Sequence, residues 1–169
     1  MYIPTLYIMV GTSGSGKSTV AKYIARTKGA VIVSPDQWRK KLTGDINNQE
    51  NNAMVWEVAY DEMLGTLFAG YDVVFDATNT TTKARKLLLD RVTTECKIVF
   101  IYVRTDLDKA LDRVKSRTNG QVAPEQVVRR QYKQLQDSLE ELLNNVFVTI
   151  VIKNNMDLDE ETLDKMRFF

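Results

Sequence analysis

The sequence predicts an α/β fold in which a five-stranded parallel sheet is flanked by helices. Five short runs rich in Val, Ile, Phe and Tyr alternate along the chain with helix-like segments. These runs are almost continuously apolar, as expected of strands that are buried on both faces. The chain has 169 residues, of which 44% are hydrophobic, so it can form a single domain with one core that needs no disulfide or structural metal.

The expected strands cover residues 6–10, 31–34, 72–76, 97–103 and 146–152. Between them, apolar side chains recur at helical spacing, which predicts amphipathic helices that pack on the sheet. The stripes comprise Trp56, Tyr60, Met63 and Leu67, then Leu107, Ala110, Leu111 and Val114, and finally Val128, Tyr132, Leu135, Leu139 and Leu142. We expect them to form the core, with a ligand contact by their aromatic rings as the alternative.

Local signals mark where several helices begin. Thr105 and Asp108 have the spacing of a capping box, and Pro124 is expected at the start of another helix. Residues 157–166 open with acids and are expected to close the fold as a short helix. The polar stretch 43–52 is either an ordinary surface loop or a moving part of an enzyme.

Composition excludes several classes of function. The 23 Lys and Arg nearly balance the 22 Asp and Glu, so a nucleic-acid partner would have to meet a local basic patch. The single cysteine, Cys96, excludes an intrachain disulfide. The absence of histidine leaves proton transfer near neutral pH to carboxylates or to the substrate itself. No stretch is long enough to span a membrane, and the apolar N-terminus lacks the basic region of a signal peptide. We therefore expect a cytoplasmic protein with no membrane partner.

The run GTSGSGKS matches G-x-x-x-x-G-K-[ST] at every fixed position, and it lies between the first strand and a helix-forming run. In such a P-loop, glycines turn successive backbone N–H groups inward at a helix N-terminus, where they bind phosphate. Lys17 is expected to reach the β- and γ-phosphates of a nucleoside triphosphate, and Ser18 to ligate the Mg²⁺ that bridges them. The residues expected to bind the nucleotide are Gly11, Thr12, Ser13, Gly14, Ser15, Gly16, Lys17, Ser18 and Thr19.

An acid and an arginine follow the second strand. In an open α/β sheet, ligands bind at the carboxyl ends of the strands, so Asp36 is expected near the P-loop, with Arg39 one helical turn further on. A carboxylate can accept the proton of an acceptor hydroxyl, and a guanidinium can hold an acceptor phosphate. The alternative is that Asp36 caps the following helix and that Arg39 pairs with a surface acid.

The third strand also ends in an acid. Asp76 follows an apolar run, as in a Walker B motif, and would bind Mg²⁺ directly or through water. Thr78 and Asn79 follow at the same edge and are expected to contact the substrate, although either could instead cap the next helix.

Residues 105–130 are expected to form a helix-loop-helix lid over the nucleotide. Arg113 and Arg117 lie near its turn, and an arginine there can neutralise charge on the transferring phosphoryl group. The alternative is a solvated basic face, which suits Arg129 and Arg130 better than Arg117.

With GTSGSGKS, SPDQWR, VVFDATN and SRTNGQVAP in this order, the chain resembles the P-loop kinase family that includes the phage-type 5′-hydroxyl polynucleotide kinases. The resemblance spans residues 7–139 and implies an adenylate-kinase-like sheet, often in a homo-oligomer. It also implies that Asp36 acts as general base and that Arg39 contacts the acceptor's phosphate. The lid arginine of the family corresponds to Arg117, with Arg113 a weaker match.

The sequence departs from that family at one position. The phage polynucleotide kinases have the acid directly before Thr-Asn, whereas here Ala77 stands there and Asp76 lies one residue earlier. The tripeptide that ends at Thr78 is D-x-T and not the D-x-D-x-T of an appended phosphatase, so we expect no phosphatase activity.

The sequence therefore favours an ATP-dependent kinase that phosphorylates a hydroxyl group, with the 5′ end of a nucleic acid as the leading acceptor. The alternative acceptor is a small molecule, nucleoside or modified base, which the near-neutral charge favours. Contacts to a polynucleotide would come from a basic groove of Arg39, Lys40, Lys41, Lys83, Arg85 and Lys86. The alternative for each of these residues is a solvated helix face.

A non-catalytic nucleotide switch is a third hypothesis. Residues 154–157 read NNMD and differ at one position from the guanine-specifying N-K-x-D of GTPases. No D-x-x-G follows the third strand to sense a γ-phosphate, so the switch is disfavoured.

Overall fold

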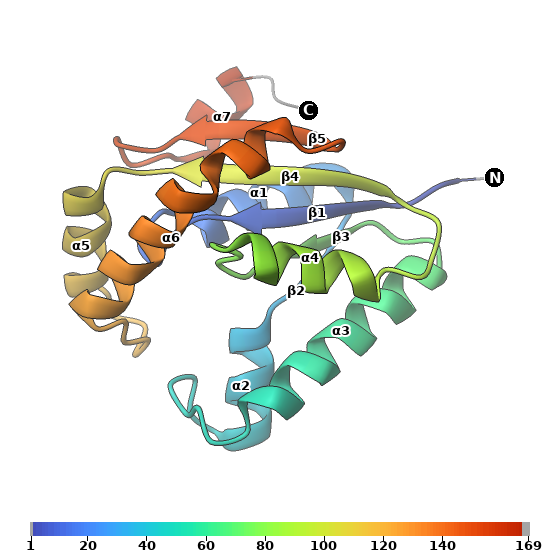
Figure 1. Cartoon of the computed structure of the whole chain (residues 1–169), viewed down its shortest axis with the longest axis horizontal. Coiled ribbons are helices and arrows are strands. Elements are labelled where there is room, and N and C mark those ends of the chain that lie inside the picture. Colours follow the sequence, from blue (N-terminus) through green and yellow to red (C-terminus); the bar gives the residue numbers. More distant parts are fainter. Residues whose placement is uncertain (1, 167–169) are drawn as a thin grey trace.

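A computed structural model describes residues 2–166 and contains a twisted sheet of five parallel strands, ordered β2-β3-β1-β4-β5 (Figure 1). The strands are β1 (Thr5–Val10), β2 (Val31–Val33), β3 (Val73–Phe75), β4 (Lys97–Arg104) and β5 (Val148–Lys153). The predicted fold class is confirmed, and each strand boundary lies within two residues of the predicted one.

β1 is the central strand, and its register explains why its side chains are so apolar. Ile8 is paired with Phe75 of β3 on one side and with Phe100 of β4 on the other. Helices cover both faces, so all of the last five β1 side chains are buried. The loop that follows Val10 therefore leaves from the middle of the sheet, at its carboxyl edge, where α/β proteins bind ligands.

The helices are α1 (Lys17–Lys28), α2 (Pro35–Thr43), α3 (Asn52–Phe68), α4 (Thr82–Arg91), α5 (Leu107–Lys115), α6 (Glu125–Asn144) and α7 (Glu160–Met166). Alternate strand residues face opposite layers, so Tyr7 and Met9 pack with α1 and α7. Leu6 and Ile8 pack with α3, α4 and α6 on the other face (Figure 1). The predicted helical stripes supply this core, with Tyr60, Met63 and Leu67 buried in α3 among others.

Two helix starts differ from the alternatives considered for the sequence. The side chain of Ser34 caps α2, where it accepts a hydrogen bond from Gln37 N at 3.4 Å, so Asp36 is not the cap. Thr81 caps α4 and accepts from Ala84 N at 3.0 Å, which leaves Thr78 and Asn79 for other contacts.

The predicted capping box at the start of α5 is wrong. Asp106 occupies the N-cap position without a side-chain cap bond. Thr105 is buried and donates instead to the carbonyl oxygens of Ser15 and Asn154, at 3.0 and 3.1 Å. Thr105 therefore makes tertiary hydrogen bonds instead of the helix cap that its spacing to Asp108 suggested. The prediction that Pro124 precedes a helix is confirmed, because α6 begins at Glu125.

Arg85 does not belong to a surface groove, contrary to the prediction. Its side chain is fully buried, donates to Asn79 O at 2.9 Å and pairs with Glu141 at 2.6 Å. It joins α4 to α6 beneath the site.

None of the helices between residues 2 and 166 has the length and apolar character needed to cross a membrane.

Candidate active site

The P-loop has a backbone that only glycine adopts easily at two positions. Gly14 and Gly16 have φ values of 79° and 90°, in the left-handed region. A Cβ at Gly14 would lie 2.2 Å from the carbonyl oxygen of Ala110, and one at Gly16 would lie 2.2 Å from Asn154 Nδ2. The loop is thus packed tightly against α5 and the segment after β5. α1 begins at Lys17, so its N-terminus faces the expected phosphate position.

Lys17 is buried at the base of this loop. Its Nζ donates to Thr12 O at 2.9 Å. Burial lowers the pKa of Lys17 to about 8, an effect that Asp76 opposes and Arg117 reinforces. A cation held in a desolvated position has a strong preference for an anionic partner, as expected of a lysine that contacts phosphate.

Ser18 and Asp76 face each other, as a magnesium site formed by both residues requires. Ser18 Oγ donates to Asp76 Oδ2 at 2.8 Å. Burial raises the pKa of Asp76, while the nearby charge of Lys17 and the Ser18 hydroxyl lower it. One hydroxyl and one carboxylate are hard oxygen donors that fit Mg²⁺, which usually takes its other ligands from phosphate and water. Within the described residues, no cluster of three carboxylate or thiolate side chains offers a complete protein cage.

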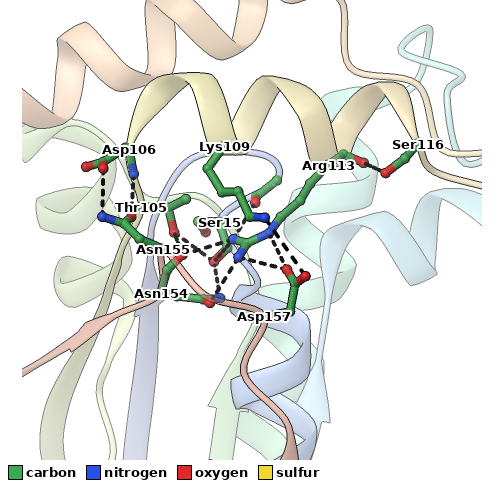
Figure 2. A network of polar contacts seen from close by, with 10 residues as sticks. Ser15, Thr105, Asp106, Lys109, Arg113, Ser116, Asn154, Asn155 and Asp157 are labelled. Carbon is green, nitrogen blue, oxygen red and sulfur yellow. Dashed lines mark hydrogen bonds and ion pairs between the residues drawn. The ribbon is translucent and has the colours of Figure 1, made fainter.

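A polar network holds the P-loop from behind (Figure 2). The carbonyl oxygen of Ser15 accepts hydrogen bonds from Asn154 Nδ2 at 2.8 Å and Thr105 Oγ1 at 3.0 Å. Arg113 donates to Gly14 O at 3.3 Å and Asn154 O at 3.1 Å. These bonds direct the loop's carbonyl groups away from the phosphate side. The near match of residues 154–157 to a guanine motif is therefore explained by a structural role of Asn154.

Arg113 also pairs with Asp157 at 3.1 Å, which ties α5 to the chain after β5 (Figure 2). Its guanidinium therefore has protein acceptors on several sides. Between the two candidate lid arginines, these contacts favour Arg117 for the phosphoryl group and assign Arg113 to the support of the P-loop.

Thr78 and Asn79 brace the front of the loop. Thr78 O accepts from Gly11 N at 3.0 Å. Asn79 is buried with φ 46°, and its Nδ2 donates to Met9 O at 2.9 Å. Thr78 also lines the cavity described next, whereas the amide of Asn79 is directed at the protein backbone. Their predicted contact with substrate therefore has geometric support at Thr78 alone.

A cavity of about 600 Å³ opens beside the P-loop, between α2, α3 and the start of α6. Asp36, Arg39 and Asp76 all line it, as does Ser13 of the P-loop. Arg39 is buried and donates both to Asp36 Oδ1 and, at 2.8 Å, to Asn52 Oδ1. The surface-acid alternative for Arg39 is thus wrong, because its ionic partner is Asp36 itself. The pair forms one wall of a pocket that can take an acceptor next to the nucleotide.

Arg117 lies on the loop after α5, and its environment differs from that of Arg113. Burial lowers the pKa of Arg117, and the charge of Asp36 opposes this. Its Nη1 is buried and has no hydrogen-bond partner among residues 2–166. The loop after α5 therefore holds a desolvated cation that has an unpartnered Nη1 and interacts electrostatically with both Lys17 and Asp36.

Two residues line the cavity although the leading expectation placed them elsewhere. Arg130, expected on a solvated face, lines the cavity, whereas its neighbour Arg129 does pair with Glu125 on the surface. Trp56 also lines the cavity while its ring packs near Phe75, with 6.2 Å between centroids. For Trp56 the ligand alternative thus has support beside the core role.

Two glutamines at the lid were also missed. Gln121 Nε2 donates to Asp36 Oδ2 at 2.8 Å, and Gln131 Oε1 accepts from Ser13 N at 2.8 Å. For Gln131, the only signal in the sequence was helical spacing, because Val127, Arg130 and Gln131 share one face of α6.

A P-loop lysine, a serine–aspartate pair and a cavity with a carboxylate and arginines define a P-loop phosphotransferase. The family described as AAA domain (AAA_33) matches residues 6–142, and the chain belongs to this family of P-loop kinases. No curated protein sequence gives a significant match.

Solved structures include similar folds. A chain of a structure described as the Pnkp1/Rnl/Hen1 RNA repair complex has a TM-score of 0.74 and 25% identity; the alignment covers 83% of this chain and 47% of that chain. The present chain thus spans about half the length of that relative. A sugar kinase from Janibacter sp. HTCC2649 has a TM-score of 0.68 and 18% identity over 97% of this chain and 91% of its own. Shikimate kinase from Acinetobacter baumannii, in complex with shikimate, has a TM-score of 0.60 and 22% identity over 97% and 90%.

Proposed function

We propose that the protein is an ATP-dependent kinase that transfers the γ-phosphate to the 5′-hydroxyl of a polynucleotide, with Asp36 as general base. The observation that carries the proposal is the Asp36–Arg39 pair in a cavity that reaches the P-loop. A carboxylate here can take a hydroxyl proton, and the buried guanidinium can hold a phosphate on the same acceptor.

A second arginine supports an acceptor that carries phosphate. Arg130 reaches the cavity from α6, while Arg39 lines it from α2. Arg130 is exposed, and no ion pair of Arg130 is found among residues 2–166. The first phosphodiester of a 5′-hydroxyl end supplies the anion that such arginines require, and a simple sugar does not. The similarity to a chain of an RNA repair complex agrees with this acceptor class.

In the proposed reaction, the 5′ oxygen attacks the γ-phosphorus, the bond to the β–γ bridging oxygen breaks, and ADP leaves. The hydroxyl proton passes to Asp36. Lys17 and Arg117 stabilise the negative charge that spreads over the γ-phosphoryl oxygens and the leaving oxygen. Mg²⁺ held by Ser18 and Asp76 would neutralise further phosphate charge. Closure of the lid would exclude water, which competes with the hydroxyl.

A small-molecule alcohol remains the competing acceptor, because the sugar and shikimate kinases share the fold over nearly their whole length. The test is a labelling assay with γ-labelled ATP and Mg²⁺, which offers 5′-hydroxyl DNA and RNA oligomers beside nucleosides, sugars and shikimate. We expect label on the oligomers, and a loss of about 10²–10⁴-fold in Asp36→Asn. Label on nucleosides or sugars alone would overturn the polynucleotide proposal, and full activity of Asp36→Asn would remove the base assignment.

A further inference from the structure

The lid loop is fastened to the acceptor side of the cavity by hydrogen bonds that span more than seventy residues of sequence. Asn47, in the loop between α2 and α3, donates from Nδ2 to Gly120 O at 3.0 Å. Its Oδ1 accepts from Val122 N at 2.9 Å. One side-chain amide thus binds the lid backbone on both sides of Gln121. Figure 1 shows these two loops facing each other below α5.

Gln121, held between these two bonds, reaches the proposed catalytic base. Its Nε2 donates to Asp36 Oδ2 at 2.8 Å, and Arg39 donates to the other oxygen, Oδ1. Both carboxylate oxygens of Asp36 therefore accept a hydrogen bond from a protein side chain. Arg39 is buried and bound to Asn52, whereas Gln121 is only half-buried, on a loop whose neighbouring residues are exposed. The oxygen that an incoming hydroxyl can take over is therefore Oδ2, at the expense of Gln121.

We infer that Gln121 is a selectivity residue that occupies the base until an anchored acceptor displaces it, so that water is not activated. The inference rests on the proposed role of Asp36 as base. An acceptor held elsewhere in the cavity can use that binding energy to displace the amide. A water molecule has no such anchor, so in the absence of acceptor Asp36 remains blocked.

The reaction that Gln121 would suppress is hydrolysis. A water oxygen attacks the γ-phosphorus, the bond to the β–γ bridging oxygen breaks, and the water proton goes to Asp36. The products are ADP and inorganic phosphate. Lys17 and Arg117 would stabilise this transition state as they stabilise transfer. Water that stays in the cavity of about 600 Å³ after closure must therefore be rejected by a separate means.

The test measures phosphate release from ATP and Mg²⁺ without acceptor, beside transfer to a 5′-hydroxyl oligomer. Gln121→Met retains the length of the side chain and removes its donors. We expect hydrolysis to rise about tenfold or more, because the variant loses a charge-assisted hydrogen bond to the base. The rate of transfer should stay within about threefold of that of the unmodified protein. Gln126→Met, at an exposed position of α6, is the matched control and should change neither rate.

Two further variants separate this role from a merely structural one. Asp36→Asn combined with Gln121→Met should return hydrolysis to background, because the added rate runs through Asp36. Asn47→Ala should lower hydrolysis and transfer together, because the freed lid withdraws Arg117 with Gln121. Unchanged hydrolysis in a Gln121→Met protein that still labels the oligomer would overturn the inference. Absence of oligomer labelling in the unmodified protein would instead overturn the proposed function. The effect of Gln121→Met on Asp36-dependent hydrolysis could still be measured in that case.

Discussion

Arg113 and Arg117 are one helical turn apart in sequence, yet the structure uses them in opposite ways. Arg113 lies behind the P-loop, where the carbonyl groups of Gly14 and Asn154 and the carboxylate of Asp157 surround its guanidinium. Arg117 lies on the front, with a buried Nη1 that has no partner among residues 2–166. A cation whose donors are satisfied stabilises the fold, and one whose donors are unused is available to a ligand. The difference supports a structural role for Arg113 and the proposed catalytic role for Arg117.

The largest effect on activity is expected from Arg117, at the front of the P-loop. Arg117→Met removes a cation expected to neutralise the transferring phosphoryl group, so kcat should fall by about 10³–10⁵-fold. The melting temperature should change little, because Nη1 makes no hydrogen bond that the fold would lose. Steady-state kinetics and thermal unfolding check both parts. A variant that melts early and keeps its kcat would reverse the roles assigned to the two arginines.

At the back, the close packing of Gly14 gives the next largest effect. Gly14→Ala would place a Cβ 2.2 Å from the Ala110 carbonyl oxygen at a positive φ of 79°. The free energy of unfolding should fall by more than the roughly 1–2 kcal/mol of a left-handed alanine alone. Gly29→Ala is the matched control, since its φ is 67° and nothing lies within 4 Å of the added Cβ. Equal losses in urea unfolding of the two variants would contradict the packing described for the P-loop.

Arg113→Met should act mainly on stability. It leaves the carbonyl oxygens of Ser15 and Asn154 with fewer donors, so we expect a loss of about 2 kcal/mol in the free energy of unfolding. For a chain of this length, the melting temperature should fall by roughly 4–8 °C. We expect kcat to stay within about tenfold of the unmodified protein. Arg26→Met, which removes an exposed ion pair to Glu160, is the control. An exposed pair contributes about 0–1 kcal/mol, so its melting temperature should shift by roughly 0–4 °C.

The smallest expected effect is the uptake of a proton by Lys17 when nucleotide binds. Burial lowers the pKa of Lys17 to about 8, so at that pH about half of the nucleotide-free molecules have a neutral Lys17. Phosphate beside Nζ favours the charged form and raises this pKa, so binding should take up about half a proton at pH 8. The affinity for nucleotide should accordingly fall as the pH rises above 8.

Calorimetry in two buffers of different ionisation enthalpy measures this uptake. Lys22→Met, at an exposed position of α1, should leave it unchanged. Lys17→Met should abolish it, and an uptake that persists in Lys17→Met would assign the proton to another group.

The hydrophobic pattern of the sequence was sufficient to predict the sheet and most of the core. Strands buried on both faces must be continuously apolar, so all five could be recognised from short windows. The P-loop was equally visible, because its glycines and lysine are fixed by the geometry of phosphate binding over eight consecutive residues.

Helix caps were harder to assign. Ser34 and Thr81 were preferred over the neighbouring Asp36 and Asn79, and Thr105 bonds to the P-loop instead of to its own helix. A polar side chain near a helix start has both local and distant acceptors to choose from. Which one it takes depends on the position of segments that are remote in sequence.

The sequence by itself determined the α/β class and located the P-loop, because both are encoded by local pattern. It also predicted Asp36, Arg39 and Asp76 as site residues from their positions after strands, and Arg117 from its place near the lid turn and from the family resemblance. Only the tertiary structure decided that Arg130 faces the cavity, that Arg85 is buried, and that Gln121 contacts Asp36. Such pairings join residues tens of positions apart. Their geometry follows from how strands and helices pack, and neighbouring residues carry no signal of it.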